Sequence, residues 1–217
     1  MAHQTSPHPP DDGLTPPAPH RVPAPAASAS AEADAGCRRL PDDVLAVRAA
    51  EGDQEAFSVL VRRHTPGLLK LAYHLLGNLP DAEEAVQDAF TSAWRRLAAF
   101  HHRASFHTWM HRITINCCLN VRRRHRTLLP LNEVPEPADS DPGGVPSSAA
   151  EADALAGALL AALERLPAHQ RICWVLYELQ GLSYRDICQI TGVGEPTVRG
   201  RLFRARRTLQ EVLAPWR

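Results

Sequence analysis

Apolar residues recur every three or four positions along most of this chain, and that spacing predicts helices. Four such stretches follow one another between residues 41 and 126, and four more fill residues 151–217. Each set can bury one small apolar core. We therefore predict an all-α protein made of two small helical domains.

Residues that commonly cap helices mark where the first helices should begin and end. Asp42 is expected to cap a helix that runs through Ala50, and Asp53 is expected to cap the next one. Pro66 lies inside the second stretch and should kink or divide its helix. Gly77 should close that helix, because glycine readily adopts the left-handed conformation of a helix end.

The third and fourth helices of this domain have the strongest patterns. Asp81 is predicted to cap the third, with Glu84 completing a capping-box spacing, and Ser105 is predicted to cap the fourth. The side chains expected to face the core are Ala85, Val86, Ala89, Phe90, Ala93, Trp94 and Leu97 in the third helix, and Phe106, Trp109, Met110, Ile113, Cys117 and Val121 in the fourth.

The second domain ends in a pattern typical of DNA-binding proteins. A helix over residues 168–180 is followed by a short helix at Tyr184–Thr191, which Ser183 should cap, and by a long helix from Glu195 to about Leu213. A short helix, a three-residue turn and a longer basic helix form a helix-turn-helix, whose second helix enters the DNA major groove.

Two segments lack the apolar residues that a core needs. Residues 1–38 consist mainly of Pro, Ala, Ser and His, and we predict a disordered tail. Residues 127–150 contain five prolines and several acids, which predicts a flexible, extended linker. This linker should let the domains at 39–126 and 151–217 lie well apart.

Composition narrows the class of protein. The net charge is zero, but residues 38–126 hold 14 basic against nine acidic side chains, whereas residues 127–154 hold six acids and no base. Two basic blocks around an acidic connector indicate two modules that meet a polyanion. Five cysteines without a C-x-x-C pair do not indicate a disulfide framework, and Cys117, Cys173 and Cys188 are expected to be buried as small apolar residues. With no secretory pattern and no run of about 20 apolar residues, we expect a cytoplasmic protein without membrane insertion.

The outward face of the fourth helix carries amides beside arginines. In such an arrangement the amides can hydrogen-bond to nucleic-acid bases while the arginines bind the backbone phosphates. The alternative is an ordinary surface helix with a basic C-terminus, which the helix dipole also favours. The residues are Asn116, Asn120, Arg123 and Arg124.

The start of the last helix also presents side chains that can read bases. Arg pairs with guanine, Glu accepts from cytosine, and Phe can rest on a thymine methyl group. A glycine here weakens the helix, and close approach to another backbone would explain it. A helical hairpin with a basic surface is the alternative. The outward residues are Glu195, Pro196, Arg199, Gly200 and Phe203.

Two stretches resemble a known family. Conserved region 2 of bacterial sigma-70 factors is similar to DAEEAVQDAF with FHHRASFHTWMHRITIN, and region 4 is similar to LPAHQRICWVLYELQGLSYRDICQITGVGEPTVRGRLFRARRTL. With only a linker between them, the pair resembles the extracytoplasmic-function (ECF) subgroup over about residues 41–214. The resemblance implies a sigma factor, without catalytic activity or cofactor, that directs promoter-specific initiation in a stress or signal response. It also implies an anti-sigma partner that masks the basic faces of the free factor.

The resemblance assigns roles residue by residue. Implied contacts to the β′ clamp of core RNA polymerase are Asp81, Glu84, Gln87, Asp88 and Thr91, and the β flap is a further implied partner. Implied contacts to the melting minus-ten element are Phe100, His101, His102, Arg103, Ala104, Ser105, Asn116, Asn120, Arg123 and Arg124. Implied contacts to the duplex minus-thirty-five element are Glu195, Pro196, Thr197, Arg199, Gly200, Phe203 and Arg204.

This sequence departs from the family pattern in two places. Pro196-Thr197 stands where Gly-Thr is frequent, and the loop His101-His102-Arg103 is unusually basic. Both departures bear on base preference, so no minus-ten sequence is predicted.

Two other functions compete with this interpretation. A stand-alone helix-turn-helix regulator would bind operators without polymerase, but it gives no role to the acidic flank of residues 81–97. A zinc hydrolase would use His107 and His111, yet that chemistry needs a glutamate where this chain has Thr108.

Overall fold

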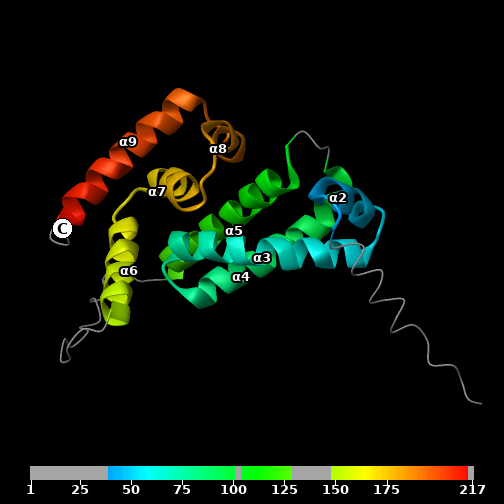
Figure 1. Ribbon diagram of the computed structural model, residues 1–217, viewed down its shortest axis with the longest axis horizontal. Coiled ribbons are helices and arrows are strands. Elements are labelled where there is room, and N and C mark those ends of the chain that lie inside the picture. Colours follow the sequence, from blue (N-terminus) through cyan, green and yellow to red (C-terminus); the bar gives the residue numbers. More distant parts are fainter. Residues whose placement is uncertain (1–38, 101–103, 129–147, 215–217) are drawn as a thin grey trace, which may run out of the picture.

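The computed structural model describes residues 39–100, 104–128 and 148–214 (Figure 1). These residues form helices and no strand, which confirms the predicted all-α class. The predicted disordered tail and most of the predicted linker lie outside the described residues.

We call residues 39–128 the first unit and residues 148–214 the second unit. The first unit contains α2 (Asp42–Ala50), α3 (Gln54–Leu76), α4 (Leu79–Arg96), the 3₁₀ turn η1 (Leu97–Ala99) and α5 (Phe106–Leu128), and the second contains α6 (Ser148–Glu164), α7 (Ala168–Trp174), the π-helical turn η2 (Val175–Leu179), α8 (Tyr184–Thr191) and α9 (Glu195–Val212).

Pro66 was predicted to kink or divide its helix. Helix α3 runs unbroken through Pro66, so the proline does not divide it. Asp53 caps the helix as predicted, accepting a hydrogen bond from the Ala56 amide at 3.0 Å, and Gly77 ends it with φ +86°. Leu68 is fully buried just beyond the proline. Core packing on both sides of Pro66 therefore holds the two halves of α3 in one helix despite the lost hydrogen bond.

Two predicted caps are wrong. Asn78, not Asp81, caps α4, because the Asn78 side chain accepts from the Asp81 amide at 2.9 Å. Pro80 then lies in the first turn, where its missing N–H group costs nothing. Helix α2 begins after Pro41, and Asp42 lies inside its first turn without a side-chain cap.

The first unit packs α3, α4 and α5 around one core. Phe106 and Met110 of α5 are fully buried, and the Ser105 hydroxyl accepts from the Thr108 amide at 3.1 Å as the predicted cap. Trp94 departs from its predicted burial, with 39% of its surface exposed. Cys118 rather than Cys117 faces the core, since Cys118 is 1% exposed and Cys117 only half-buried.

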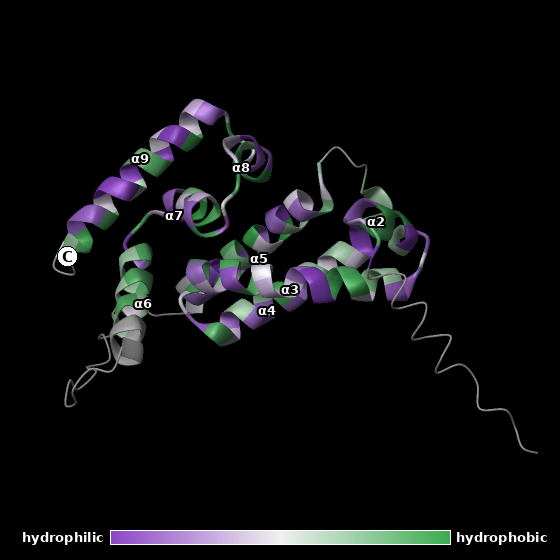
Figure 2. Cartoon of the chain, in the orientation of Figure 1, coloured by the Kyte–Doolittle hydropathy of each residue, from purple (hydrophilic) through white to green (hydrophobic). Residues whose placement is uncertain are grey.

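The second unit contains the predicted helix-turn-helix, with one change. The expected helix over residues 168–180 leaves α-helical geometry after Trp174 and continues as η2, where the Gln180 amide bonds the Val175 carbonyl five residues back. Ser183 caps α8 as predicted, and Gly192 ends it with φ +70°. Cys173 is buried as predicted, whereas Cys188 is half-buried. Figure 2 shows that much of α9 is hydrophilic.

The two units are in contact, whereas the linker was expected to let them lie well apart. Helix α5 packs on α8, and α3 contacts α6 and α7 (Figure 1). The buried Arg171 of α7 donates to the Leu75 carbonyl of α3 at 2.9 Å and to the Glu164 carbonyl at 2.7 Å. Burial, reinforced by nearby Arg122, lowers the pKa of Arg171 to about 10. A buried cation needs such carbonyl partners, so Arg171 ties the second unit to the first.

Candidate functional site

The start of α9 presents its predicted DNA-reading side chains to solvent. Val198 and Leu202 anchor the helix on the core, with at most 1% of their surface exposed. Phe203 is 69% exposed, which is unusual for a large apolar side chain. The remaining predicted residues on this surface are exposed, apart from the half-buried Gly200: they are Glu195, Pro196, Thr197, Arg199 and Arg204.

Arg199 is held from two directions. Its Nε and Nη2 atoms donate to the Glu195 carboxylate at 2.9 and 2.6 Å. Its guanidinium carbon lies 5.3 Å from the ring centroid of Tyr184. Arg199 is therefore partly neutralised on the surface that the sequence assigned to DNA.

Gly200 does not touch another backbone within the described residues, contrary to expectation. A Cβ at this position would meet only the Arg204 guanidinium, at 3.6 Å and beyond. The glycine instead leaves room for the Arg204 guanidinium beside it.

The loop before α5 is anchored where it leaves η1. Phe100 packs against Trp109, with ring centroids 4.9 Å apart, and against Phe106 at 6.1 Å. Ala104 is half-buried, and Ser105 is exposed where it caps α5. The predicted base-contacting residues His101, His102 and Arg103 lie outside the described residues.

Helix α5 exposes Asn116 and Asn120 one turn apart. Arg123 donates to the Asn120 side-chain oxygen at 3.1 Å, which orients that amide. Arg124 instead bonds Glu84 of α4 at 2.7 Å, and so joins a predicted DNA contact to a predicted polymerase contact. Both partners are about half exposed, so the pair contributes little to stability.

The acidic flank lies on the outer face of α4. Glu84, Gln87, Asp88 and Thr91 are exposed, and the half-buried Asp81 lies 3.4 Å from His125 of α5. Sequence reasoning thus placed these polar residues on the solvent side of α4.

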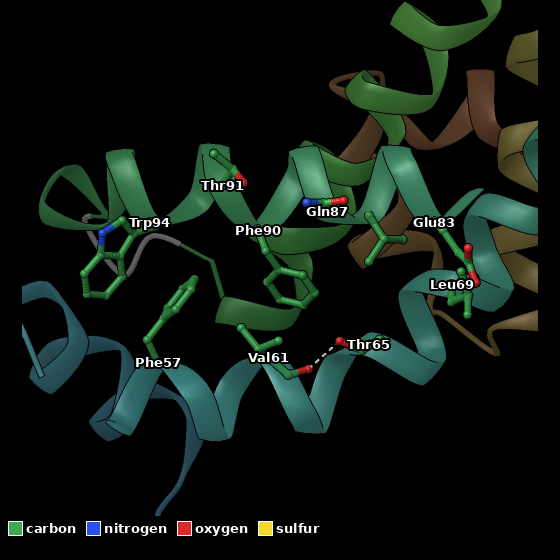
Figure 3. Close-up of a pocket in the computed structure, with 10 residues that line it drawn as sticks. Phe57, Val61, Thr65, Leu69, Glu83, Gln87, Phe90, Thr91 and Trp94 are labelled. Atoms are coloured by element: carbon green, nitrogen blue, oxygen red, sulfur yellow. Dashed lines mark hydrogen bonds between the residues drawn. The ribbon is translucent and has the colours of Figure 1, made fainter. Parts of the chain in front are cut away.

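An apolar groove beside this flank was missed. It has a volume of about 580 Å³ and lies between α3 and α4, with Gln87 and Thr91 among its lining residues (Figure 3). Phe57 and Trp94 contact each other at one end, with ring centroids 4.8 Å apart and the rings tilted by 54°. The signal in the sequence was a tryptophan at the edge of an apolar stripe, which predicted core rather than groove. The other lining residues are Val61, Thr65, Leu69, Glu83, Val86 and Phe90.

A second groove of about 390 Å³ lies on the second unit between α6, α7 and α9. Trp174, Leu209 and Leu213 line it, and Leu155 at its edge is 53% exposed. Each unit therefore carries an apolar groove of its own.

Of the two histidines considered as a zinc pair, His111 is buried and His107 is half-buried. The rings of His107 and His111 stack 4.0 Å apart, and the His111 Nδ1 atom donates to the His107 carbonyl at 2.8 Å. Burial lowers the pKa of His111 to about 4. In the described part of the chain no three His, Cys, Asp or Glu side chains form a group that could hold a metal ion, and no helix could cross a membrane.

Comparison with known proteins agrees with this arrangement. Residues 60–127 match the family described as Sigma-70 region 2, and residues 156–209 match Sigma-70, region 4. The ECF RNA polymerase sigma factor SigM of Mycobacterium tuberculosis is 37% identical over 177 residues, which cover 81% of this chain and 85% of SigM. The ECF RNA polymerase sigma-E factor of Escherichia coli K12 is 34% identical over 187 residues, which cover 82% and 96% of the two chains. CnrH, solved in complex with the cytosolic domain of CnrY, superposes with a TM-score of 0.62 at 28% identity over 80% of this chain and 97% of CnrH.

Proposed function

Since the chain belongs to the extracytoplasmic-function sigma factors of the sigma-70 family, we propose that its two units each recognise a different promoter element. The chain binds core RNA polymerase and promoter DNA and directs promoter-specific transcription initiation. Residues 39–126 then act as region 2, residues 151–217 act as region 4, and 127–150 connect them. Binding and strand separation account for this function, so we assign the chain no catalytic chemistry.

One observation carries the proposal for the second unit. Helix α9 starts with a cluster of solvent-facing polar, cationic and aromatic side chains, Arg199 and Phe203 among them, on a helix whose other face is fully buried. A helix presented in this way fits the major groove, where arginine and phenylalanine read base edges. We assign this surface to the minus-thirty-five element.

The first unit is proposed to hold the minus-ten element as its strands part. Asn116 and Asn120 lie on one exposed face of α5, and Phe100 packs against Trp109 near the start of the same helix. Drawing a base out of the duplex costs a few kcal/mol, which contacts to the unpaired strand must offset. Amides on a rigid helix can supply these contacts without becoming ordered on binding.

Polymerase docking is proposed to use both the polar flank of α4 and the neighbouring groove. Gln87 and Thr91 belong to the flank and also line the groove. Protein interfaces combine an apolar centre with a polar rim, and this surface offers both within one helix length. The groove on the second unit is the corresponding candidate for the β flap.

We further propose that an anti-sigma protein controls the chain and that it acts in the cytoplasm, where polymerase meets the chromosome. The related CnrH was solved with the cytosolic domain of CnrY bound, which supports a protein partner of this kind. A stress or signal response is the corresponding setting.

Transcription in vitro with bacterial core polymerase on a promoter library tests the proposal. The purified chain should direct initiation from a defined subset of promoters, and Arg199→Ala should impair promoter choice while polymerase binding remains. A gel shift with and without core polymerase separates the competing function, because a stand-alone regulator binds duplex operators without polymerase. Failure to associate with core polymerase would refute the proposal.

A further inference from the structure

Two tyrosine rings with an arginine at either end form a row across the second unit. The Arg199 guanidinium lies 5.3 Å from the centroid of the Tyr184 ring, and the rings of Tyr184 and Tyr177 lie 5.1 Å apart at 38°. The Arg206 guanidinium lies 5.3 Å from the Tyr177 ring and bonds the Glu178 carboxylate at 2.8 Å. We call Arg199, Tyr184, Tyr177 and Arg206 the Arg–Tyr row.

Three elements build the row. Both arginines come from α9, seven residues apart and therefore on one face of that helix. Tyr184 is the first residue of α8, and the π-helical turn η2 supplies Tyr177 and Glu178. Turns of this type are rare and frequently lie at functional sites. The departure of η2 from α-helical geometry thus occurs at the residues that hold Arg206.

The row ends at the side chain assigned to base reading. Arg199 is 66% exposed, and a long side chain in water samples many rotamers unless neighbouring groups restrain it. A ring against the guanidinium face restrains it within cation–π distance. The ring covers a face of the guanidinium and leaves its N–H edge uncovered. Glu195 takes the Nε and Nη2 atoms of that edge, and the edge is the part of arginine that pairs with guanine.

We propose that Tyr184, supported by Tyr177 and Arg206, is a positioning residue that holds Arg199 in the orientation for reading the minus-thirty-five element. This inference rests on the proposed function of α9. It makes base discrimination at one position depend on an aromatic ring that need not touch DNA. A direct contact of the Tyr184 hydroxyl with a phosphate is the competing explanation, and it predicts a different response to loss of the hydroxyl.

The test uses holoenzyme reconstituted from the full chain and bacterial core polymerase. Wild-type holoenzyme first selects its upstream element from a duplex library randomised there, and affinity is then measured for the selected duplex, its single-base variants and random duplex. Tyr184→Leu should lower discrimination about threefold to tenfold at the base position that Arg199→Ala also affects, with affinity for random duplex unchanged. Tyr184→Phe, which keeps the ring, should retain wild-type discrimination, and Tyr184→Leu should add nothing in the Arg199→Ala background.

Two further measurements keep the result interpretable. Thermal unfolding shows whether each variant folds, and Tyr177→Leu, one step further from Arg199, should give a smaller loss at the same base position. Equal loss of affinity for every sequence, failure of Tyr184→Phe, or an additive effect with Arg199→Ala would overturn the positioning role. If wild-type holoenzyme selects no sequence, the proposed function of α9 itself fails; if it selects one and Tyr184→Leu discriminates equally well, only the positioning role fails.

Discussion

At the scale of single residues, Glu195 has two opposite effects on the surface proposed for DNA. It restrains Arg199 through bonds of 2.6 and 2.9 Å, yet it also places a negative charge where phosphates must approach. Such an exposed pair contributes at most a few tenths of a kcal/mol to folding. Its main effect is therefore expected on binding.

Glu195→Gln should raise affinity for duplex DNA of any sequence severalfold, because it removes a charge that repels phosphate and releases one that attracts it. The dependence of the affinity on salt should steepen at the same time. Fluorescence anisotropy of holoenzyme with a labelled random duplex measures both. Glu211→Gln is the matched control, since Glu211 forms the same type of i,i+4 pair with Arg207 near the other end of α9. An unchanged affinity for Glu195→Gln would contradict this account of Glu195.

Three histidines lie close together where α2, α3 and α5 meet. His64 lies 2.8 Å from the Asp42 carboxylate, and its ring is 6.0 Å from that of His107, which stacks on His111. Burial is the main cause that lowers the pKa of all three histidines. The Asp42 carboxylate opposes this effect at His64, and Asp42 and Asp186 of α8 both oppose it at His107. The fold therefore favours the neutral form of these rings.

Stability should consequently fall as the solution becomes more acidic. Below pH 6.5 the unfolded chain gains a proton on His111 that the folded chain does not accept until about pH 4, so the free energy of unfolding is highest above pH 6.5 and declines toward pH 4. For His111 alone the loss between pH 7 and pH 5 is about 2 kcal/mol. Urea unfolding at each pH measures it.

His111→Leu should flatten that decline, because leucine takes up no proton in the unfolded chain. The His111 ring donates through Nδ1, so its Nε2 atom is an acceptor, and that atom has no hydrogen-bond partner within the described residues for leucine to remove. The exposed His169→Leu is the control and should keep the wild-type slope. An equally steep decline in His111→Leu would show that other groups cause it.

At the scale of elements, local signals in the sequence located the starts of three helices and misplaced those of α2 and α4. Asp53, Ser105 and Ser183 cap the helices predicted for them, because a cap depends on hydrogen bonds to an amide three residues away. Trp94 was misplaced because the apolar stripe of α4 is wider than the surface that α3 and α5 cover. Turn η2 could not be predicted, because the apolar pattern of residues 168–180 fits an uninterrupted α-helix equally well.

Part of the candidate site could also be predicted from the sequence, namely the residues that helical periodicity places on the surface. The exposed residues of α9 follow directly from helical periodicity, as do Asn116 and Asn120 on α5. Tyr184 was missed because its role depends on side chains brought together from three elements. The ion pair between Arg124 and Glu84 was missed for the same reason, since 40 residues separate the partners.

The groove between α3 and α4 gives a prediction at this scale. Trp94→Ala should weaken binding of core polymerase about tenfold, because a partly exposed tryptophan in an apolar groove has the character of an interface hot spot. The variant should also lose some stability, because most of the Trp94 surface is covered and its ring contacts Phe57, so thermal unfolding must show that it is folded at the assay temperature. Val44→Ala on α2, where 43% of the side chain is exposed, is the matched control. Unchanged polymerase affinity in Trp94→Ala would move the docking surface elsewhere.

At the scale of the whole molecule, the contact between the units opposes the proposed function. Recognition of two separate promoter elements requires the units to part, yet α5 packs on α8 and Arg171 crosses to α3. Leu119 of α5 and Ile172 of α7 line the same narrow gap at this contact. The structure is therefore a closed form that polymerase must open.

Leu119→Arg should open the closed form without unfolding either unit. The new cation would lie close to Arg122 and the buried Arg171, and like charges repel strongly where water is excluded. Small-angle scattering should give a larger radius of gyration than wild type, while circular dichroism shows unchanged helix content. Leu119→Met keeps the apolar contact and should scatter like wild type. An unchanged radius in Leu119→Arg would mean that this gap does not hold the units together.

The carbonyl of Leu75 is shared by donors from both units, Arg122 at 3.1 Å and Arg171 at 2.9 Å. When the second unit swings away, Arg122 still satisfies this acceptor, so the departure leaves no orphaned group in α3. Arg171 loses its hydrogen bond to α3, and water then hydrates its guanidinium. Opening is thus cheap for the unit that we propose to hold the minus-ten element, and it uncovers a cation on the unit that we propose to read the duplex.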